Sequence, residues 1–198
     1  MNKFFSLLFI LISGFVFSQD VTDFLGIPEL TFNENKYVLN SSNQKSKIQY
    51  VQNYILQDER IEDASNVISI YYFVKDIDAK EATMHKTDEL ENRKSTDKFC
   101  NYNVTQNPNA TEFLVDFITS NVPKSKDEPA PETEQADYNV YRFKNVMIGD
   151  KLTFLIIAYK EKSTGDIKDF TKLIGRKRNK ILEGIITMTV PAINLKTN

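Results

Sequence analysis

Hydrophobic residues follow two different patterns along this chain. The first is a predominantly apolar stretch from Phe4 to Phe17, which follows a short basic start and precedes Ser18 and Gln19. This arrangement is typical of a secretory signal peptide that is cleaved near Ser18/Gln19. The stretch is shorter than the roughly 20 residues of a bilayer span, and no second stretch of this kind follows. We therefore expect a signal peptide over residues 1–18, no integral membrane span, and a secreted or periplasmic product.

The second pattern is a series of short runs rich in β-branched and aromatic residues, which predict strands. Turn residues at 33–36, 107–110 and 149–150 predict three hairpins, so the strands should pair antiparallel. Within the third run, alternation predicts that Ile48, Tyr50, Tyr54 and Leu56 share one buried face. The expected strands are Leu30–Phe32, Tyr37–Leu39, Ile48–Leu56, Val67–Val74, Phe99–Gln106, Thr111–Ser120, Tyr138–Ile148 and Lys151–Lys160.

Two segments carry helical spacing instead. The first begins at Asp78, whose carboxylate is a suitable N-cap, and runs to about Arg93 with a thin apolar stripe. The second runs from about Asp166 to Glu183, with a stronger stripe and Gly184 available just beyond its end. The chain is therefore predicted to be α+β, with an antiparallel sheet of about 6–8 strands and two helices packed on it in an α/β/α sandwich.

The segment from Val122 to Ala136 is rich in Pro and charged residues and has no periodicity. Such a segment buries too little apolar surface to offset the entropy of ordering it. We expect a mobile loop at residues 122–136 within a single α+β domain spanning residues 19–198.

Charge and cysteine content argue against several classes of function and structure. Without residues 1–18 the chain has 24 basic and 27 acidic side chains, a net charge of −3, which argues against a protein devoted to nucleic acid. Cys100 is the only cysteine, so neither an intramolecular disulfide nor a multi-thiolate metal site can form.

The common catalytic and cofactor motifs are missing from the sequence. His85 is the only histidine, it falls on a polar part of the first helix, and we expect both His85 and Cys100 to be dispensable. The six glycines form no phosphate-binding motif, and no Gly-x-Ser-x-Gly elbow or acidic calcium loop occurs. We therefore expect no cofactor, no metal and, on balance, no enzyme.

One acidic residue requires inspection. Asp116 interrupts the apolar run from Phe113 to Ile118. We interpret Asp116 as a cross-strand partner of Arg142 or as a residue on a solvated edge, in preference to a catalytic acid. Two carboxylates can converge from anywhere in a chain, so an extracytoplasmic hydrolase with carboxylate chemistry stays an alternative.

The second helix carries a regular row of cations. Lys168, Lys172, Arg176 and Lys180 follow one another at four-residue intervals, which places them on one side of the helix, opposite the apolar stripe. We call these four residues the cationic row. A solvated helix face is the ordinary interpretation of such a row, and a binding site for an anionic surface polymer is the functional one.

The order of the predicted elements resembles that of the PsbP-like α/β/α sandwich, over Leu30 to about Gly184. The pattern Phe32-Asn33, Tyr37 and Leu39 is also similar to the start of small uncharacterised secreted proteins of Gram-negative bacteria. The resemblance implies an accessory role, because PsbP-like proteins are mostly binding or assembly factors, and it transfers no site. We expect an exported binding or protein-interaction module whose partner is a protein or an anionic envelope or extracellular polymer.

The signal peptide is testable directly. Mass spectrometry of the exported protein should find Gln19, or its cyclised pyroglutamate form, at the N-terminus, because the apolar stretch is too short to anchor the chain. Recovery of the uncleaved chain from an integral membrane fraction would contradict this prediction.

Overall fold

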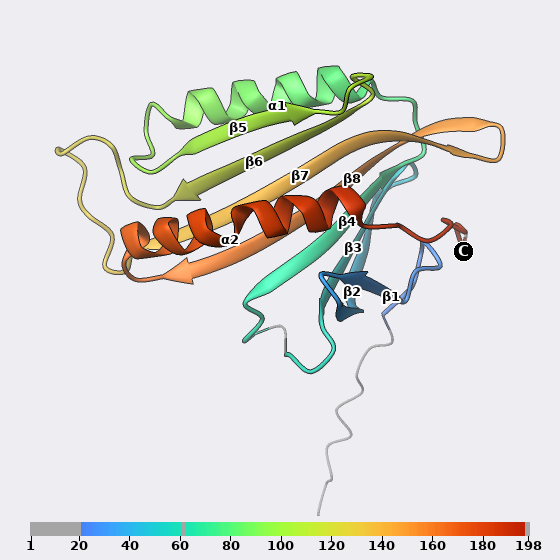
Figure 1. Cartoon of the computed structure of the whole chain (residues 1–198), viewed down its shortest axis with the longest axis horizontal. Coiled ribbons are helices and arrows are strands. Elements are labelled where there is room, and N and C mark those ends of the chain that lie inside the picture. The colour runs from blue at the N-terminus through green and yellow to red at the C-terminus, as the bar shows by residue number, and fades with distance from the viewer. Residues whose placement is uncertain (1–20, 61, 197–198) are drawn as a thin grey trace, which may run out of the picture.

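The computed structural model describes residues 21–60 and 62–196, and the expected signal peptide lies outside these residues. Eight strands and two helices follow one another along the described chain (Figure 1). In order they are β1 (Glu29–Phe32), β2 (Asn35–Ser46), β3 (Gln49–Leu56), β4 (Asn66–Phe73), α1 (Ala79–Arg93), β5 (Asn101–Gln106), β6 (Glu112–Ser120), β7 (Gln135–Ile148), β8 (Lys151–Thr164) and α2 (Ile167–Thr187).

The strands form one antiparallel sheet in the order β1-β2-β3-β4-β8-β7-β6-β5. It consists of two four-stranded meanders that meet where β4 pairs with β8, from Asn66 opposite Glu161 to Phe73 opposite Phe154. Helix α1 packs on β5, β6 and β7, and α2 packs on β7 and β8. The predicted α+β fold, with an antiparallel sheet and two helices packed on it, is confirmed.

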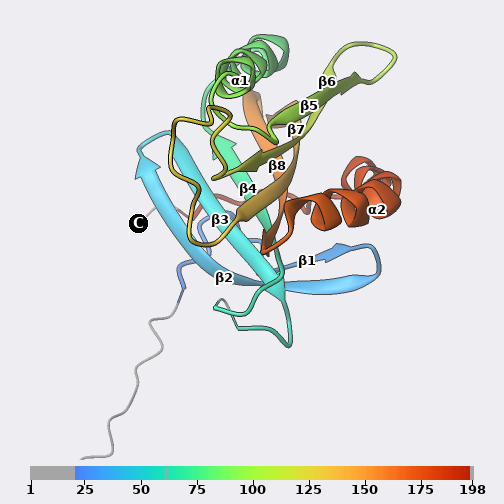
Figure 2. The ribbon, with the colours of Figure 1, turned by 90° about the vertical axis from the view of Figure 1, so that its left-hand side faces the viewer.

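The two helices cover opposite faces of the sheet, because alternate residues of the same strand enter different cores. In β6, Phe113, Val115 and Phe117 join Leu90 of α1 in the smaller core. Leu114 points the other way, into the larger core that contains the apolar side of α2. Figure 2 shows α1 and α2 on either side of the strands.

The sheet is curled around the larger core. Phe32 of β1 and Tyr159 of β8 lie with their ring centroids 5.4 Å apart. These strands are four positions apart in the sheet, which in a flat sheet would separate them by roughly 19 Å. The curl thus brings the β1–β2 hairpin against α2 (Figure 2).

Strand β2 is longer than the sequence predicted, and β3 is buried on both faces. The polar continuation of β2 to Ser46 is held by pairing with β3, a tertiary effect that hydropathy does not reveal. In β3, Tyr50 and Tyr54 face the larger core, whereas Ile48 lies before the strand and is 44% exposed. Val51 and Ile55 of the opposite face are also buried.

Helix α2 continues beyond its predicted end at Glu183 and ends at Thr187. Gly184 is therefore a residue of the helix and does not terminate it. A Cβ at Gly184 would lie 2.7 Å from Cε2 of Phe32, so glycine is required for the close approach of α2 to the β1–β2 turn. The predicted starts are confirmed, since Asp78 accepts a hydrogen bond from Glu81 N and Asp166 from Lys168 N and Asp169 N.

The connection between β6 and β7 is anchored at both ends. Val122 O accepts a hydrogen bond from Lys98 N, and Lys124 N donates to Thr96 O. At the other end, Gln135 N donates to the Asn121 side chain, and Gln135 and Ala136, which were predicted as loop, belong to β7. Residues 124–130 are all exposed.

The mobility of this loop stays a prediction, and trypsin tests it. We expect the first cleavage after Lys126, because Lys124 is held by its backbone N and by a hydrogen bond from its Nζ to Lys94 O. Lys126→Gln should delay the first cut and Lys124→Gln should leave its rate unchanged. A first cut after Lys144 of β7 would show that the strand, and not the loop, opens first.

Candidate functional site

All four residues of the cationic row, which lies on α2, are exposed. Lys172 Nζ lies 2.8 Å from Asp169 Oδ1, and the other three form no ion pair within the described part of the chain. The hydrogen bond from Lys172 lowers the pKa of Asp169 and raises the pKa of Lys172. The row therefore presents its charge to solvent, as its spacing predicted.

The next two cations of α2 turn toward the sheet. Arg178 donates to both oxygens of Asp116, at 2.8 and 2.7 Å, a bidentate geometry that fixes the guanidinium. Lys177 binds Glu161. Because Asp116 and Glu161 are buried in β6 and β8, these contacts fix both the position and the rotation of α2 on the sheet.

The predicted pairing of Asp116 with Arg142 is wrong. Val140 is the cross-strand neighbour of Asp116, and Arg142 lies opposite Leu114. Arg142 instead binds Glu112 through Nε at 2.8 Å and caps the end of α2 by donating to Ile185 O at 3.1 Å. The alternative of a solvated edge is also wrong, since Asp116 is 4% exposed.

Two acids of this region, Glu112 and Glu161, are each bound by more than one donor. Burial acts to raise the pKa of Glu112, but hydrogen bonds and charges from Arg142 and Lys144 outweigh it and lower the pKa. Tyr159 donates to Glu161 at 2.7 Å, and burial is the main cause that raises the pKa of Tyr159. Donors therefore hold the oxygens of both acids in place.

The Tyr138 hydroxyl is buried without a hydrogen-bond partner among the described residues. Burial raises the pKa of Tyr138, and the charge of Asp116 adds to this effect. Tyr138 therefore stays neutral beneath α2, and no open cavity of those found in the described chain reaches it.

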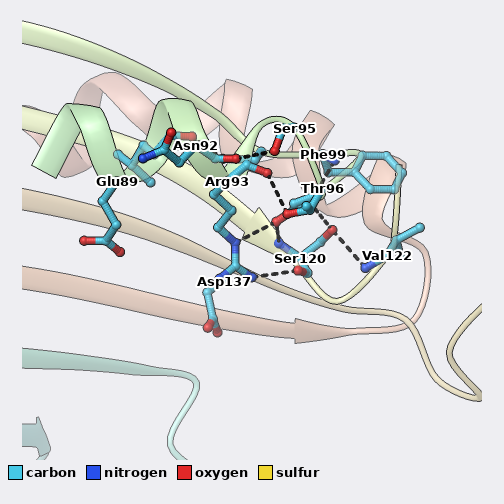
Figure 3. A network of polar contacts seen from close by, with 12 residues as sticks. Glu89, Asn92, Arg93, Ser95, Thr96, Phe99, Ser120, Val122 and Asp137 are labelled. Carbon is cyan, nitrogen blue, oxygen red and sulfur yellow. Dashed lines mark hydrogen bonds and ion pairs between the residues drawn. The ribbon is translucent and has the colours of Figure 1, made fainter. Parts of the chain in front are cut away.

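A second buried acid fixes the end of α1. The Asp97 carboxylate accepts from Ser120 N and Ser120 Oγ, both at 2.5 Å, and from Phe99 N at 3.0 Å. Arg93 Nε also donates to it at 3.0 Å, while Arg93 Nη2 donates to Ser120 O at 2.8 Å. Figure 3 shows Arg93 extending from α1 to Ser120. The sequence reasoning missed this network, although Asp97 lies at a helix end before a strand.

Beside this network, the ends of β6, β7 and β8 enclose a groove of about 410 Å³. We call it the strand-end groove. It contains three cations, one acid and six side chains that carry a hydroxyl or an amide group. Its lining residues are Arg93, Thr119, Ser120, Asn121, Gln135, Ala136, Asp137, Lys160, Lys162, Ser163 and Thr164.

A hollow of similar volume, about 420 Å³, lies between the end of α2, the following tail and the β7–β8 hairpin. Its walls are mainly aliphatic and include Ile148, Ile186 and Val190. The cations Arg142 and Lys144 at this hollow share Glu112, so much of their charge is already balanced.

His85 and Cys100 lie in separate environments. His85 is exposed on α1, whereas Cys100 is buried and its Sγ lies 3.6 Å from Leu90 O. Burial raises the pKa of the Cys100 thiol, which disfavours the reactive thiolate. Their dispensability stays a prediction.

The described residues contain neither a cluster of metal-ligating side chains nor a helix that could span a membrane. Within residues 21–60 and 62–196, no group of three or more His, Cys, Asp or Glu side chains converges as metal ligands would. None of the described helices combines the length and the apolar character that crossing a bilayer requires.

Comparison with known proteins gives one match. A protein-family model matches residues 25–190, and that family is uncharacterised. No curated protein and no solved structure matches the chain significantly. The matched range runs from the segment before β1 to just beyond α2, and so includes all the elements described above.

The Arg178–Asp116 contact should be among the most stabilising in the molecule. Arg178→Met leaves the Asp116 carboxylate buried without its cation, so we expect the free energy of unfolding to fall by about 3 kcal/mol in urea denaturation. Combining it with Asp116→Leu should restore most of the loss, because no buried charge then remains.

Lys172→Met is the matched control, because it removes an exposed ion pair from the same helix. It should change stability little. Equal stabilities for Arg178→Met and Lys172→Met would show that the buried contact does not hold α2.

Proposed function

The chain belongs to this uncharacterised family over residues 25–190, and from that premise we propose a non-catalytic binding protein, acting in the periplasm or outside the cell, that holds an anionic polymer on α2. The observation that carries the proposal is the exposure of all four residues of the cationic row on a helix whose rotation is fixed by buried ion pairs. The PsbP-like resemblance supports the same accessory role and is part of the proposal.

The geometry of the row fits a linear partner. Residues four apart on a helix lie about 6 Å apart along its axis, so Lys168 and Lys180 are separated by roughly 18 Å. Because Lys177 and Arg178 bind acids of the sheet, the row cannot rotate into the core without breaking both contacts. A polymer with repeated negative charges can therefore contact all four cations at once.

The acids of the interior favour binding over hydrolysis. A carboxylate that acts as a general acid needs a raised pKa, which requires an apolar site or a second unpaired carboxylate. The buried acids Asp97, Asp116 and Glu161 are each held by a cation, Arg93, Arg178 and Lys177 respectively. These contacts engage the carboxylate oxygens, so the three acids serve as partners of ion pairs that join helices to the sheet.

Charge reversal of the row tests the proposal. The probe is immobilised dextran sulfate. We expect the protein to be retained at low salt and released as salt is raised, because exposed charges are screened. Lys168→Glu, Lys172→Glu, Arg176→Glu and Lys180→Glu together should weaken retention at least about tenfold, since attraction becomes repulsion.

The matched control makes the same change in net charge elsewhere. It combines Lys45→Glu, Lys47→Glu, Lys80→Glu and Lys151→Glu, four lysines that are also exposed. The control should keep most of the retention, and both variants should unfold at the urea concentration of the parent chain. Equal loss in the two variants would mean that only net charge matters, and the proposed site would be wrong.

A further inference from the structure

We propose that the strand-end groove binds an acidic saccharide, a sugar unit that carries one oxyanion, at a site separate from the cationic row of α2. The lining residues Lys160 and Lys162 alternate along β8 with Glu161, which binds Lys177 of α2. The groove therefore opens on the face of the sheet opposite α2. This inference does not depend on the proposed function of the row.

The groove has a net positive charge. Its lining contains Arg93, Lys160 and Lys162 against the acid Asp137, and Arg93 is also paired with the buried Asp97, which leaves a net charge of +1. Asp137 binds Lys160 at 2.8 Å, whereas Lys162 forms no ion pair with the described residues. An oxyanion in the groove would therefore meet the uncompensated cation Lys162 without displacing an internal ion pair.

Arg93 is oriented before any ligand arrives. Its Nε donates to the buried Asp97 and its Nη2 to Ser120 O, and no hydrogen bond from Nη1 is found within the described chain. Figure 3 shows this guanidinium directly above Asp137, which lines the same groove. A donor held in this way loses little entropy on binding, and its planar fork matches an oxyanion.

The rest of the lining is suited to hydroxyl groups. Thr119, Ser120, Asn121, Gln135, Ser163 and Thr164 contribute hydroxyls and amides, and Ala136 is the only apolar residue of the lining. No apolar side chain larger than that of Ala136 lines the groove, so an acyl chain or an aromatic ring would find no aliphatic or aromatic side chain to pack on. A volume of about 410 Å³ lies within the usual range for small-ligand sites.

The walls are fixed by the base of the β6–β7 connection. Asn121 donates from Nδ2 to Thr133 O at 2.9 Å and accepts from Gln135 N at 2.8 Å. Gly165 N donates to Glu134 O at 2.8 Å, which joins the end of β8 to the same segment. Backbone and side-chain donors on three strands are thus held in place, as selective binding of a polar ligand requires.

Two-dimensional ¹⁵N NMR titration of the full mature chain tests the site. The probes are trigalacturonate, galactose 6-sulfate, neutral maltotriose and inorganic phosphate. We expect saturable shifts at Thr119, Gln135 and Ser163 with the acidic sugars, and none with maltotriose. Whichever acidic sugar binds more tightly identifies the oxyanion as carboxylate or sulfate. Phosphate binding as tight as that of both sugars would overturn the assignment to a saccharide, and no shift with any probe would overturn the site.

Variants separate this site from the cationic row of α2. Lys162→Gln should weaken binding of the acidic sugar about tenfold without unfolding, because Lys162 makes no ion pair in the described structure. Arg93→Lys is a second variant that retains the charge but loses the fork, and it should also weaken binding. The charge-reversed α2 variant should bind the sugar unchanged. Loss of sugar binding in that variant, or full binding by Lys162→Gln, would contradict the proposal.

Discussion

The contact between Arg178 and Asp116 fixes how α2 is oriented on the sheet, and thereby which of its side chains face solvent. The carboxylate lies in the middle of β6, deep in the interior, and its charge requires a cation from the helix above. Once Arg178 meets that requirement, and Lys177 does the same for Glu161, the rotation of α2 is decided. Helical geometry then places residues 168, 172, 176 and 180 in solvent. The exposed face of α2 is therefore a consequence of the charges buried beneath it.

Much of the fold was readable from the sequence because its signals are local. Hairpin turns and N-cap carboxylates act within a few residues, and Asp78 and Asp166 begin helices as expected. The end of α2 could not be predicted from the sequence. Gly184 does not end the helix but allows it to approach Phe32 closely, and Phe32 is distant in sequence. The polar end of β2 was missed for a similar reason, since pairing with β3 and not hydropathy holds it in the sheet.

The candidate sites also differ in whether their sequence signals are local or depend on long-range contacts. The cationic row follows from periodicity alone, so its position on one helix face could be predicted. The partner of Asp116 depends on register and helix docking, and the sequence suggested Arg142, whereas the structure places Arg178 there. The strand-end groove gave no sequence signal. Its cations come from α1 and β8, and the network that orients Arg93 joins Asp97, which precedes β5, to Ser120 at the end of β6.

The junction of β4 with β8 has a consequence for how the chain folds. Its partners, from Phe73 with Phe154 to Asn66 with Glu161, lie 81 to 95 residues apart. Pairing within each meander closes shorter loops, whereas pairing of β4 with β8 closes a long one. The entropy cost of closing this loop precedes the free energy gained from the new contacts. The two meanders can therefore form early as separate hairpin arrays, and their union is the slow event. Until β8 joins, the apolar strand β4 is an open sheet edge, the state in which this chain is most exposed to aggregation.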